Sequence, residues 1–479
     1  MNYLKTLTEL YRMKKQTRLS PENMKKLQDG KLRKLLHYAW DHSAYYRRTF
    51  AHAGITEEQL DELPLSCFPT LDKKILLEHF DELITLPDVT QEDLRKFDEE
   101  IEADRNPYDG KYHVVHSSGS TGKPGYFVYD EAAWNSMLLG IIRGALWNMT
   151  MPQILKLLLK RPRIVYIAAT DGRYGGAMAV GDGIDGVGAK QMYLDIKTPL
   201  PEWVEKLKEF QPNIVIGYPS AIKIMAELVE QDEIEVEIEK VISCGEPLGT
   251  SLRTYLEKIF KTPVINIYGA SESLALGVET DPKEGMLLFD DLNVIEVESG
   301  VMYLTSLYNY AQPLIRYRLS DHLTLQAPEK NDPWPFTRAV GLLGRNEDIL
   351  WFEDSFGRRE FLHPLAIEGF CIEGLKDYQF CQIGTDAFEM YAQIADGASE
   401  SKIRSEMMAQ MGGILREKHL DYVQFYVNFV DEILPDPRTG KKPLILLPEK
   451  ITRETWKEKT DRKKQEKERN NENEYDIAG

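Results

Sequence analysis

The chain has 479 residues, with 59 lysines and arginines against 77 aspartates and glutamates, a formal net charge of −18. A surface of this sign repels polyanions, which argues against a nucleic-acid-binding protein or one held electrostatically on an anionic membrane. The length is sufficient for two or three domains with sizeable cores.

The four cysteines, at positions 67, 244, 371 and 381, show neither C-x-x-C spacing nor a histidine pattern typical of a metal site. Reduced thiols of this kind are usual in the cytoplasm. The first 16 residues are charged throughout and contain no apolar secretory core, and no apolar run is long enough to span a bilayer. We therefore expect a globular, cytoplasmic protein.

Residues 1–100 are predicted to be mainly helical. Leu32, Leu35 and Leu36 begin an amphipathic pattern that continues to Arg48, and helical spacing resumes at residues 73–80 after two prolines.

A loop rich in glycine and hydroxyl groups follows the strand-like segment 111–116 and precedes the helical pattern of residues 131–149. It consists of Ser117, Ser118, Gly119, Ser120, Thr121, Gly122 and Lys123. Backbone N–H groups, hydroxyls and a lysine together suit phosphate oxygens. Pro124 directly after the lysine excludes a Walker A loop, which continues into a helix. Taken alone, the loop is equally consistent with a surface turn.

Residues 163–269 alternate apolar strand-like runs with helical patterns. The strands are expected at 163–169, 213–217, 239–243 and 264–267, and the helices at 202–210, 220–230 and 248–260. This order predicts an α/β domain with a mainly parallel sheet flanked by helices.

Small, polar or aromatic residues follow each of these strands. They are Tyr174, Gly175 and Gly176; Tyr218 and Pro219; Gly245, Glu246 and Pro247; and Tyr268, Gly269, Ala270, Ser271 and Glu272. Each group could be an ordinary turn. Because ligands bind beyond the carboxyl ends of parallel strands, a shared cleft explains all four groups together.

Residues 286–326 are β-rich, with a hairpin expected at residues 299–300 and a further strand that places Arg316 and Arg318 on one face. We place a domain boundary at 343/344, after a proline-rich linker. Residues 344–449 are expected to form a small α+β domain with strands at 378–383, 389–394 and 424–430 and a helix at 400–418. Residues 450–479 are almost wholly polar, which favours a disordered tail.

Six segments occur in an order that resembles the adenylate-forming enzyme superfamily: SSGSTGKPG, CGEPLG, YGASES, RYRLSDH, GRNED and PRTGK. The segments HYAWDHSAYYRRTF and GYPS, and the glycine-rich region around Tyr174, resemble its phenylacetate–CoA ligase and coenzyme F390 synthetase-like branch. The similarity extends from about residue 30 to about residue 445.

This resemblance implies ATP-dependent activation of a carboxylic acid, an aryl or arylacetic acid, to an acyl-adenylate, with release of pyrophosphate and transfer to coenzyme A. Residues 117–123 would hold the β- and γ-phosphates, and Glu272 would bind Mg²⁺. Ser271 would bind the α-phosphate, Tyr268 and residues 245–247 would enclose the adenine, and Asp321 would bind the ribose with Arg345 nearby.

The small domain is implied to act as a mobile lid that brings Lys441 to the carboxylate and the α-phosphate. Lys441, Lys123 and Ser271 are thus the expected catalytic residues, and Tyr174, Gly175, Gly176, Tyr218 and Pro219 the expected acid-binding residues. The protein would work as a monomer or a homodimer on a small-molecule acid.

Alternatives remain at single residues and for the whole activity. Glu272 could cap a following helix, Asp321 could be a turn residue, and Lys441 could be a solvated surface lysine beside Lys442. His116, Tyr174 and Tyr218 could be packed residues rather than walls of an acid pocket. The acceptor could be a carrier protein, AMP itself could be transferred, or the chain could bind nucleotide without turnover.

Three departures from the family pattern affect the second half-reaction most. Ser320 replaces a glycine, Glu347 replaces the usual hinge aspartate, and the segment FEDSFGRREFLHP does not align with the strand that lines the thiol tunnel of the relatives.

Overall fold

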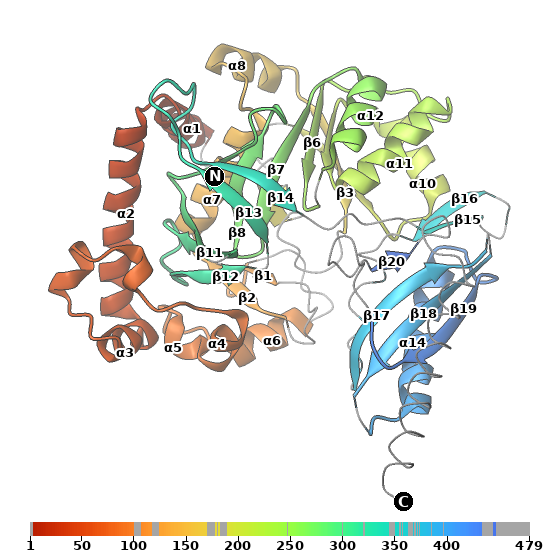
Figure 1. The fold of residues 1–479 in the computed structure, drawn as a ribbon. Coiled ribbons are helices and arrows are strands. Elements are labelled where there is room, and N and C mark those ends of the chain that lie inside the picture. Colours follow the sequence, from red (N-terminus) through yellow and green to blue (C-terminus); the bar gives the residue numbers. More distant parts are fainter. Residues whose placement is uncertain are drawn as a thin grey trace, which may run out of the picture. The chain divides into compact units, whose positions relative to one another are not determined.

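The computed structural model describes residues 3–99, 107–116, 124–169, 178–179, 181–182, 189–246, 248–298, 300–319, 321–343, 350–353, 356, 358–362, 367, 370, 372, 374–384, 386–395, 397–433 and 444–446. The chain divides into two compact units (Figure 1). The first comprises Met1–Ile196 and Trp203–Arg345, and the second comprises Lys197–Glu202 and Asn346–Gly479. The division at 345/346 lies two residues from the boundary expected at 343/344.

The regular elements of residues 3–99 are helices. They are α1 (Tyr3–Gln16), α2 (Pro21–His42), α3 (Ala44–His52), the 3₁₀ helices η1 (Glu58–Asp61) and η2 (Leu65–Cys67), α4 (Lys73–Glu78), α5 (Phe80–Leu83) and α6 (Gln91–Glu99). Helix α2 begins with Ser20 as N-cap and Pro21 at its first position, which is the preferred start of a helix. Its buried face contains Leu35, Leu36 and Ala39, close to the expected pattern.

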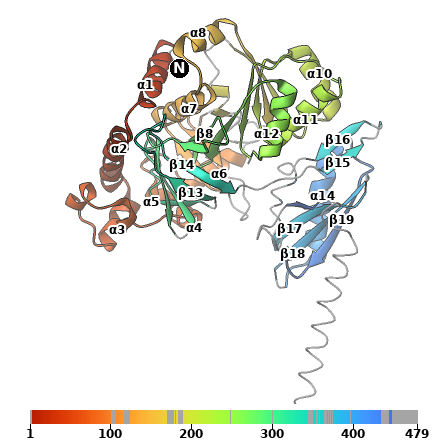
Figure 2. The ribbon, with the colours of Figure 1, turned by 45° about the horizontal axis from the view of Figure 1, so that its top comes forward.

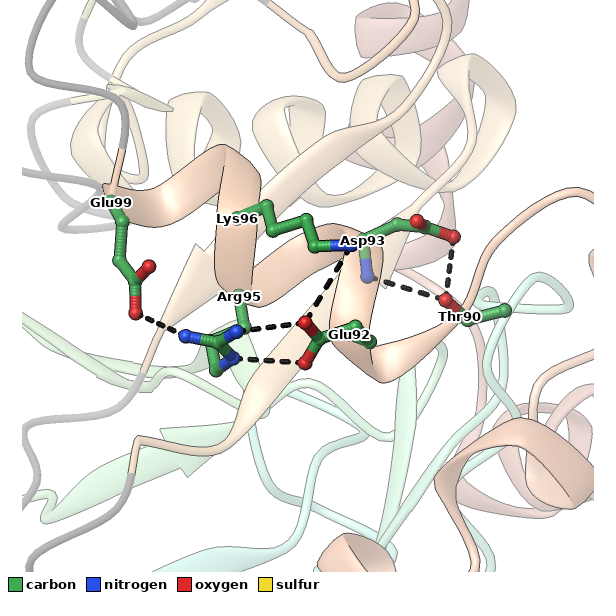
Figure 3. Close-up of polar contacts among 6 residues, drawn as sticks. All are labelled: Thr90, Glu92, Asp93, Arg95, Lys96 and Glu99. Atoms are coloured by element: carbon green, nitrogen blue, oxygen red, sulfur yellow. Dashed lines mark hydrogen bonds and ion pairs between the residues drawn. The ribbon is translucent and has the colours of Figure 1, made fainter.

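Helix α6 is short, and polar contacts on its exposed side support it (Figure 3). At its start, Thr90 Oγ1 donates to Asp93 Oδ2 over 2.5 Å and accepts from Asp93 N over 3.2 Å. Arg95 makes two hydrogen bonds to Glu92 and one to Glu99. Such exposed pairs contribute a few tenths of a kcal/mol each. The helix matters for the site because Asp98, near its end, contacts the hairpin described next.

The strands on either side of residues 117–123 form an antiparallel hairpin, β1 (His113–His116) and β2 (Tyr126–Tyr129), with His116 opposite Tyr126 and His113 opposite Tyr129. The sequence predicts the first strand but not the second. Helix α7 (Glu131–Ala145) follows, capped by Asp130, and then α8 (Met151–Leu159).

In the described part of the chain, nine strands form the main sheet in the order β13-β14-β9-β8-β7-β6-β5-β3-β4. Their bounds are β3 (Arg163–Ala168), β4 (Lys190–Asp195), β5 (Ile214–Gly217), β6 (Lys240–Cys244), β7 (Val264–Ala270), β8 (Ser273–Glu279), β9 (Met286–Leu288), β13 (His322–Gln326) and β14 (Arg338–Leu343). Strands β4, β3, β5, β6 and β7 are parallel neighbours, and from β7 to β13 the pairing is antiparallel.

The four predicted strands of the alternating region correspond to β3, β5, β6 and β7, and the predicted helices to α10 (Leu200–Phe210), α11 (Pro219–Glu230) and α12 (Thr250–Phe260). Helix α11 packs on β3, β5 and β6, α12 packs on β7, and α7 packs on β7 and β8. Figures 1 and 2 show α11 and α12 gathered along the parallel half of the sheet. The α/β class expected from the sequence is therefore confirmed.

A smaller sheet contains β10 (Asn293–Glu298), β11 (Val301–Ser306) and β12 (Tyr317–Leu319). The predicted hairpin is confirmed, since Glu298 pairs with Val301. The prediction that Arg316 and Arg318 share a strand face is wrong. Arg316 precedes β12 with φ of 51°, and its buried guanidinium donates to Glu296 Oε2 (3.1 Å) and to Ser66 O (2.8 Å), whereas Arg318 is exposed.

The second unit contains the hairpin β15 (Leu350–Glu353) and β16 (Arg359–Leu362), and a sheet in the order β19-β18-β17-β20. The elements of the sheet and its helix are β17 (Leu375–Gln382), β18 (Ala387–Ile394), α14 (Glu400–Glu417), β19 (Gln424–Val430) and β20 (Ile445–Leu446). Phe380, Phe388, Ile403, Met407 and Met411 form its core. Residues 197–202 belong to this unit, where Glu360 accepts from Leu200 N (2.6 Å) and pairs with buried Lys418 (3.1 Å).

No helix among the described residues is both long and apolar enough to cross a membrane. The tail 450–479 lies outside the described residues.

Candidate functional site

The carboxyl ends of β3, β5, β6 and β7 lie along one edge of the main sheet, because these strands are parallel and adjacent. The structure describes the residues after β5 and β7, and after β6 as far as Glu246; residues 170–177, after β3, lie outside it. The shared edge expected from the sequence is therefore present, and its side chains can be followed individually.

The segments after β5 and β6 meet through Tyr218 and Gly245. Tyr218 precedes α11 as its N-cap residue, with Pro219 at the first helical position, and its ring is buried. Gly245 has φ of +80°, and a Cβ atom there would lie 2.5 Å from Tyr218 Cε1. Both the left-handed backbone and the close approach require glycine at this position.

The Glu246 side chain serves the neighbouring helix. Its Oε2 accepts from Ser220 N (3.2 Å) and Ser220 Oγ (2.6 Å) in the first turn of α11. A carboxylate at a helix N-terminus is stabilised by the helix dipole. This arrangement engages one carboxylate oxygen of Glu246 at the start of α11.

Residues 271–272 form the turn between β7 and β8. Ala270 pairs with Ser273, and the register shifts between Tyr268 and Ala270. A Cβ atom at Gly269 would lie 2.4 Å from Leu274 O, so the tight crossing needs glycine there. A strand follows this turn, not a helix, which rules out the interpretation of Glu272 as a helix cap.

The pKa of Glu272 is raised to about 7, mainly by burial and to a smaller extent by the nearby Asp321 carboxylate. The Lys73 ammonium and a hydrogen bond with Tyr317 act in the opposite direction. Asp321 likewise raises the pKa of Tyr268, after the larger effect of burial, and Tyr268 donates to Met302 Sδ (3.5 Å). The structure thus brings together Tyr268, Glu272 and Asp321, three of the residues selected from the sequence.

Two residues of this cluster, Lys73 and Tyr317, are missed by sequence reasoning. Lys73 is the first residue of α4, behind the N-cap Asp72. Leu71 forms a bridge with Tyr317, and its backbone N–H donates to Arg316 O (3.0 Å). Lys73 lies far from Tyr268, Glu272 and Asp321 in the sequence, and no spacing pattern links it to them, so this cation enters the cluster through tertiary pairing alone.

Ser271 and His116 connect the turn to the hairpin that carries residues 117–123. Ser271 Oγ donates to His116 O (3.3 Å). Asp98 Oδ2 contacts both His116 Nδ1 (3.1 Å) and Tyr126 OH (3.3 Å), which fixes this cross-strand pair. The carboxyl end of β1, from which the chain continues into residues 117–123, therefore lies beside Ser271.

Several selected residues lie outside the described residues: Ser117, Ser118, Gly119, Ser120, Thr121, Gly122, Lys123, Tyr174, Gly175, Gly176, Pro247, Arg345 and Lys441. Among the residues that are described, no group of three or more His, Cys, Asp or Glu side chains could enclose a metal ion. Magnesium in nucleotide sites commonly takes one or two carboxylates together with phosphate oxygens and waters. A single hard oxygen donor such as Glu272 fits that mode of binding.

Comparison with known proteins identifies the family. The sequence profile of the family described as AMP-binding enzyme matches residues 51–288. Phenylacetate-coenzyme A ligase from Pseudomonas putida is 25% identical over 353 residues, covering 69% of this chain and 72% of that protein. Indoleacetate–lysine synthetase from Pseudomonas savastanoi is 32% identical over 136 residues, covering 27% of this chain and 34% of that protein.

Among solved structures, 2-hydroxyisobutyryl-CoA ligase in complex with its acyl-adenylate and CoA, in the thioesterification state, matches with a TM-score of 0.58 and 18% identity, covering 90% of this chain and 91% of that one. This match supports the fold. The family profile and the similarity to several phenylacetate-coenzyme A ligases place the chain in the adenylate-forming enzyme superfamily, in a phenylacetate–coenzyme A ligase-like branch.

Proposed function

We propose that the chain activates a carboxylic acid with ATP and transfers the acyl group to coenzyme A. In the first step an oxygen of the acid attacks the α-phosphorus of ATP, and the bond to pyrophosphate breaks. In the second step the thiol sulfur attacks the acyl carbon, and AMP leaves as the thiol proton is lost. One observation carries the proposal. Ser271 and Glu272 lie in a turn with Asp321 nearby, and this turn contacts the β1–β2 hairpin, whose strands flank residues 117–123 in the sequence.

Each polar group at this edge has a task in the first step. Negative charge accumulates on the α-phosphate, and the Ser271 hydroxyl and the Lys123 and Lys441 ammonium groups are proposed to stabilise it. Asp321 is proposed to accept hydrogen bonds from the ribose hydroxyls, and Tyr268 and the backbone of residues 245–247 to enclose the adenine. Mg²⁺, when bound, would neutralise phosphate charge, and Glu272 is the residue proposed to hold it.

An aryl or arylacetic acid is the proposed substrate. The support comes from the relatives named phenylacetate-coenzyme A ligase and from the buried Tyr218 ring at the site edge, since an aromatic side chain suits the wall of an aromatic pocket. Tyr174, Gly175, Gly176 and Pro219 are proposed to complete this wall.

The acceptor is the least constrained part of the proposal. The match to a synthetase named for indoleacetate and lysine favours testing an amine as a second candidate, since an amine can also displace AMP from an acyl-adenylate. A carrier-protein thiol is a third acceptor to compare with coenzyme A.

The test is acid-dependent exchange of labelled pyrophosphate into ATP across a panel of aryl, arylacetic and aliphatic acids. Coenzyme A, a phosphopantetheinylated carrier protein and lysine are then compared as acceptors. We expect exchange with an aromatic acid, and Glu272→Gln should lower its rate by about two to three decades while the protein stays folded. Glu284→Gln, at an exposed carboxylate, serves as the matched control.

Tight ATP binding without exchange for any acid would overturn the proposal and favour a nucleotide-binding protein without turnover. Normal exchange in folded Glu272→Gln would leave the activity standing and would remove Glu272 from the metal site.

A further inference from the structure

A buried tyrosine on β2 contacts the backbone of the turn at residues 271–272. The Tyr129 side chain is fully buried, and its hydroxyl lies 3.0 Å from Ser271 O and 3.1 Å from Glu272 O. A single O–H thus donates to two consecutive carbonyl oxygens.

These two carbonyls belong to the turn between β7 and β8, which follows the register shift between Tyr268 and Ala270. A buried carbonyl without a donor costs about 1–3 kcal/mol, so the hydroxyl fixes the orientation of both peptide planes. The direction in which the Glu272 side chain leaves the backbone follows from those planes. The Tyr129 hydroxyl therefore helps to set the direction in which the Glu272 side chain leaves the backbone, and Tyr317 contacts the carboxylate itself.

The partner strand of β2, β1, also contacts this turn. His116, on β1, accepts from Ser271 Oγ, while Tyr129, on β2, donates to Ser271 O and Glu272 O. The two strands are joined by residues 117–123. Both strands of the hairpin therefore hold the turn that carries the proposed metal carboxylate.

We propose that Tyr129 is a positioning residue that holds the Glu272 carboxylate for the metal-bound nucleotide. The inference rests on the proposed function, because it takes Glu272 as the metal ligand. Partners that orient a metal ligand typically change metal affinity or activity by about 10–100-fold when they are removed.

A neighbouring tyrosine provides the matched control. The Tyr308 side chain is also buried, and its hydroxyl lies 2.8 Å from Ser273 Oγ, which in turn donates to Asn293 Oδ1 (3.1 Å). Tyr308→Phe removes a buried hydroxyl one residue beyond the turn but leaves the donor to residues 271 and 272 in place. The two variants should therefore lose similar thermal stability.

The experiment measures ATP binding without turnover, in the absence of any acid, as a function of Mn²⁺ concentration, and then the rate of pyrophosphate exchange. We expect Tyr129→Phe to need about ten-fold more Mn²⁺ for half-saturation and to exchange pyrophosphate about ten-fold more slowly. Tyr308→Phe should stay within about two-fold of the native protein on both measures.

Equal Mn²⁺ dependence in Tyr129→Phe and the native protein, or equal shifts in both tyrosine variants, would overturn the inference. Glu272→Gln distinguishes this failure from that of the proposed function: if it shifts the Mn²⁺ dependence and Tyr129→Phe does not, only the positioning inference fails. If Glu272→Gln shifts nothing, the positioning inference and the assignment of Glu272 to the metal both fail, while acid-dependent pyrophosphate exchange by the native protein still decides the proposed activity. Should Tyr129→Phe not fold, fluorotyrosine at position 129 changes donor strength without removing the hydroxyl, and an unchanged Mn²⁺ dependence would then count against the inference.

Discussion

Burial raises the pKa of two carboxyl groups of the first unit to about 7, and the two have different surroundings. Glu272 lies in a turn at the site edge, with Asp321 and the Lys73 ammonium nearby. Asp290 is buried just after β9, and its Oδ2 accepts from Thr337 N over 2.6 Å. A raised pKa therefore does not mark a site here. What marks a site is the set of neighbouring groups. Of these two carboxyl groups, only Glu272 lies beside other residues of the shared edge.

Asp290 provides a prediction about the pH dependence of stability. In the unfolded chain its carboxyl loses the proton near its ordinary pKa of 3.8, whereas in the folded protein it keeps the proton up to about pH 7. Between these values the folded state binds more protons, so the free energy of unfolding falls as pH rises. Asp290→Asn keeps an acceptor for Thr337 N and removes this titration.

We expect Asp290→Asn to gain stability relative to the native protein by about 2–4 kcal/mol between pH 4 and pH 8. The measurement is urea unfolding at several pH values, and the contribution of Glu272 cancels in the comparison. Parallel curves for the two proteins would mean that Asp290 is already charged in the folded state at neutral pH.

At the scale of single elements, helix α7 is tied to the segment after β9 by a buried ion pair. The Arg143 guanidinium makes two hydrogen bonds to the Asp291 carboxylate, at 2.6 and 2.9 Å, and both side chains are fully buried. The Phe289 ring lies 4.6 Å from the guanidinium carbon. Because α7 also packs on β7 and β8, this pair supports the strands on either side of the turn at 271–272.

We expect Arg143→Met to lower the free energy of unfolding by about 3–5 kcal/mol, since it leaves a buried carboxylate without its partner. The double variant Arg143→Met with Asp291→Asn should recover much of that loss. Arg95→Met on α6 is the matched control, because its pairs with Glu92 and Glu99 are exposed and should cost less than about 1 kcal/mol. Similar losses in the two single variants, measured by urea unfolding, would show that the buried pair has no special contribution.

The elements that the sequence predicts best are those whose own residues decide them. Strands β3, β5, β6 and β7 are apolar runs buried in the sheet, and the helices between them have clear apolar spacing. Strand β4 is missed because its residues, Lys190–Asp195, are mixed in character and mostly only partly buried. The strand expected through Arg316 fails because a left-handed residue interrupts the alternation.

The site is predictable only where a motif carries it. Tyr268, Ser271, Glu272 and Asp321 can be selected from the order of segments in the sequence. Lys73 and Tyr129 cannot be selected in this way, because each comes from an element far from the turn in the sequence. Neither residue belongs to a recognisable motif. Contacts made by tertiary packing leave no signal in local spacing.

At the scale of the whole molecule, the chain consists of two units, each with its own core. The second unit resumes at Asn346, so Glu347 lies directly after the division between the units. Lys441 belongs to the second unit as well. Both lie outside the described residues. We propose that this unit acts as a lid that rotates about residues 345–348 and presents Lys441 in only one of its orientations.

If the lid alternates, the two half-reactions should respond differently to the two substitutions. Lys441→Ala should lower acyl-adenylate formation by about two to three decades, since it removes a cation from the transition state, and should largely spare thiol transfer from preformed acyl-adenylate. Lys442→Ala is the matched control and should affect neither step. Glu347→Pro should slow thiol transfer most, because a proline restricts the backbone rotation at the hinge. Pyrophosphate exchange and single-turnover thioester formation measure the steps separately. Equal losses in both steps for both variants would indicate a fixed arrangement of the two units, with Lys441 an ordinary surface lysine.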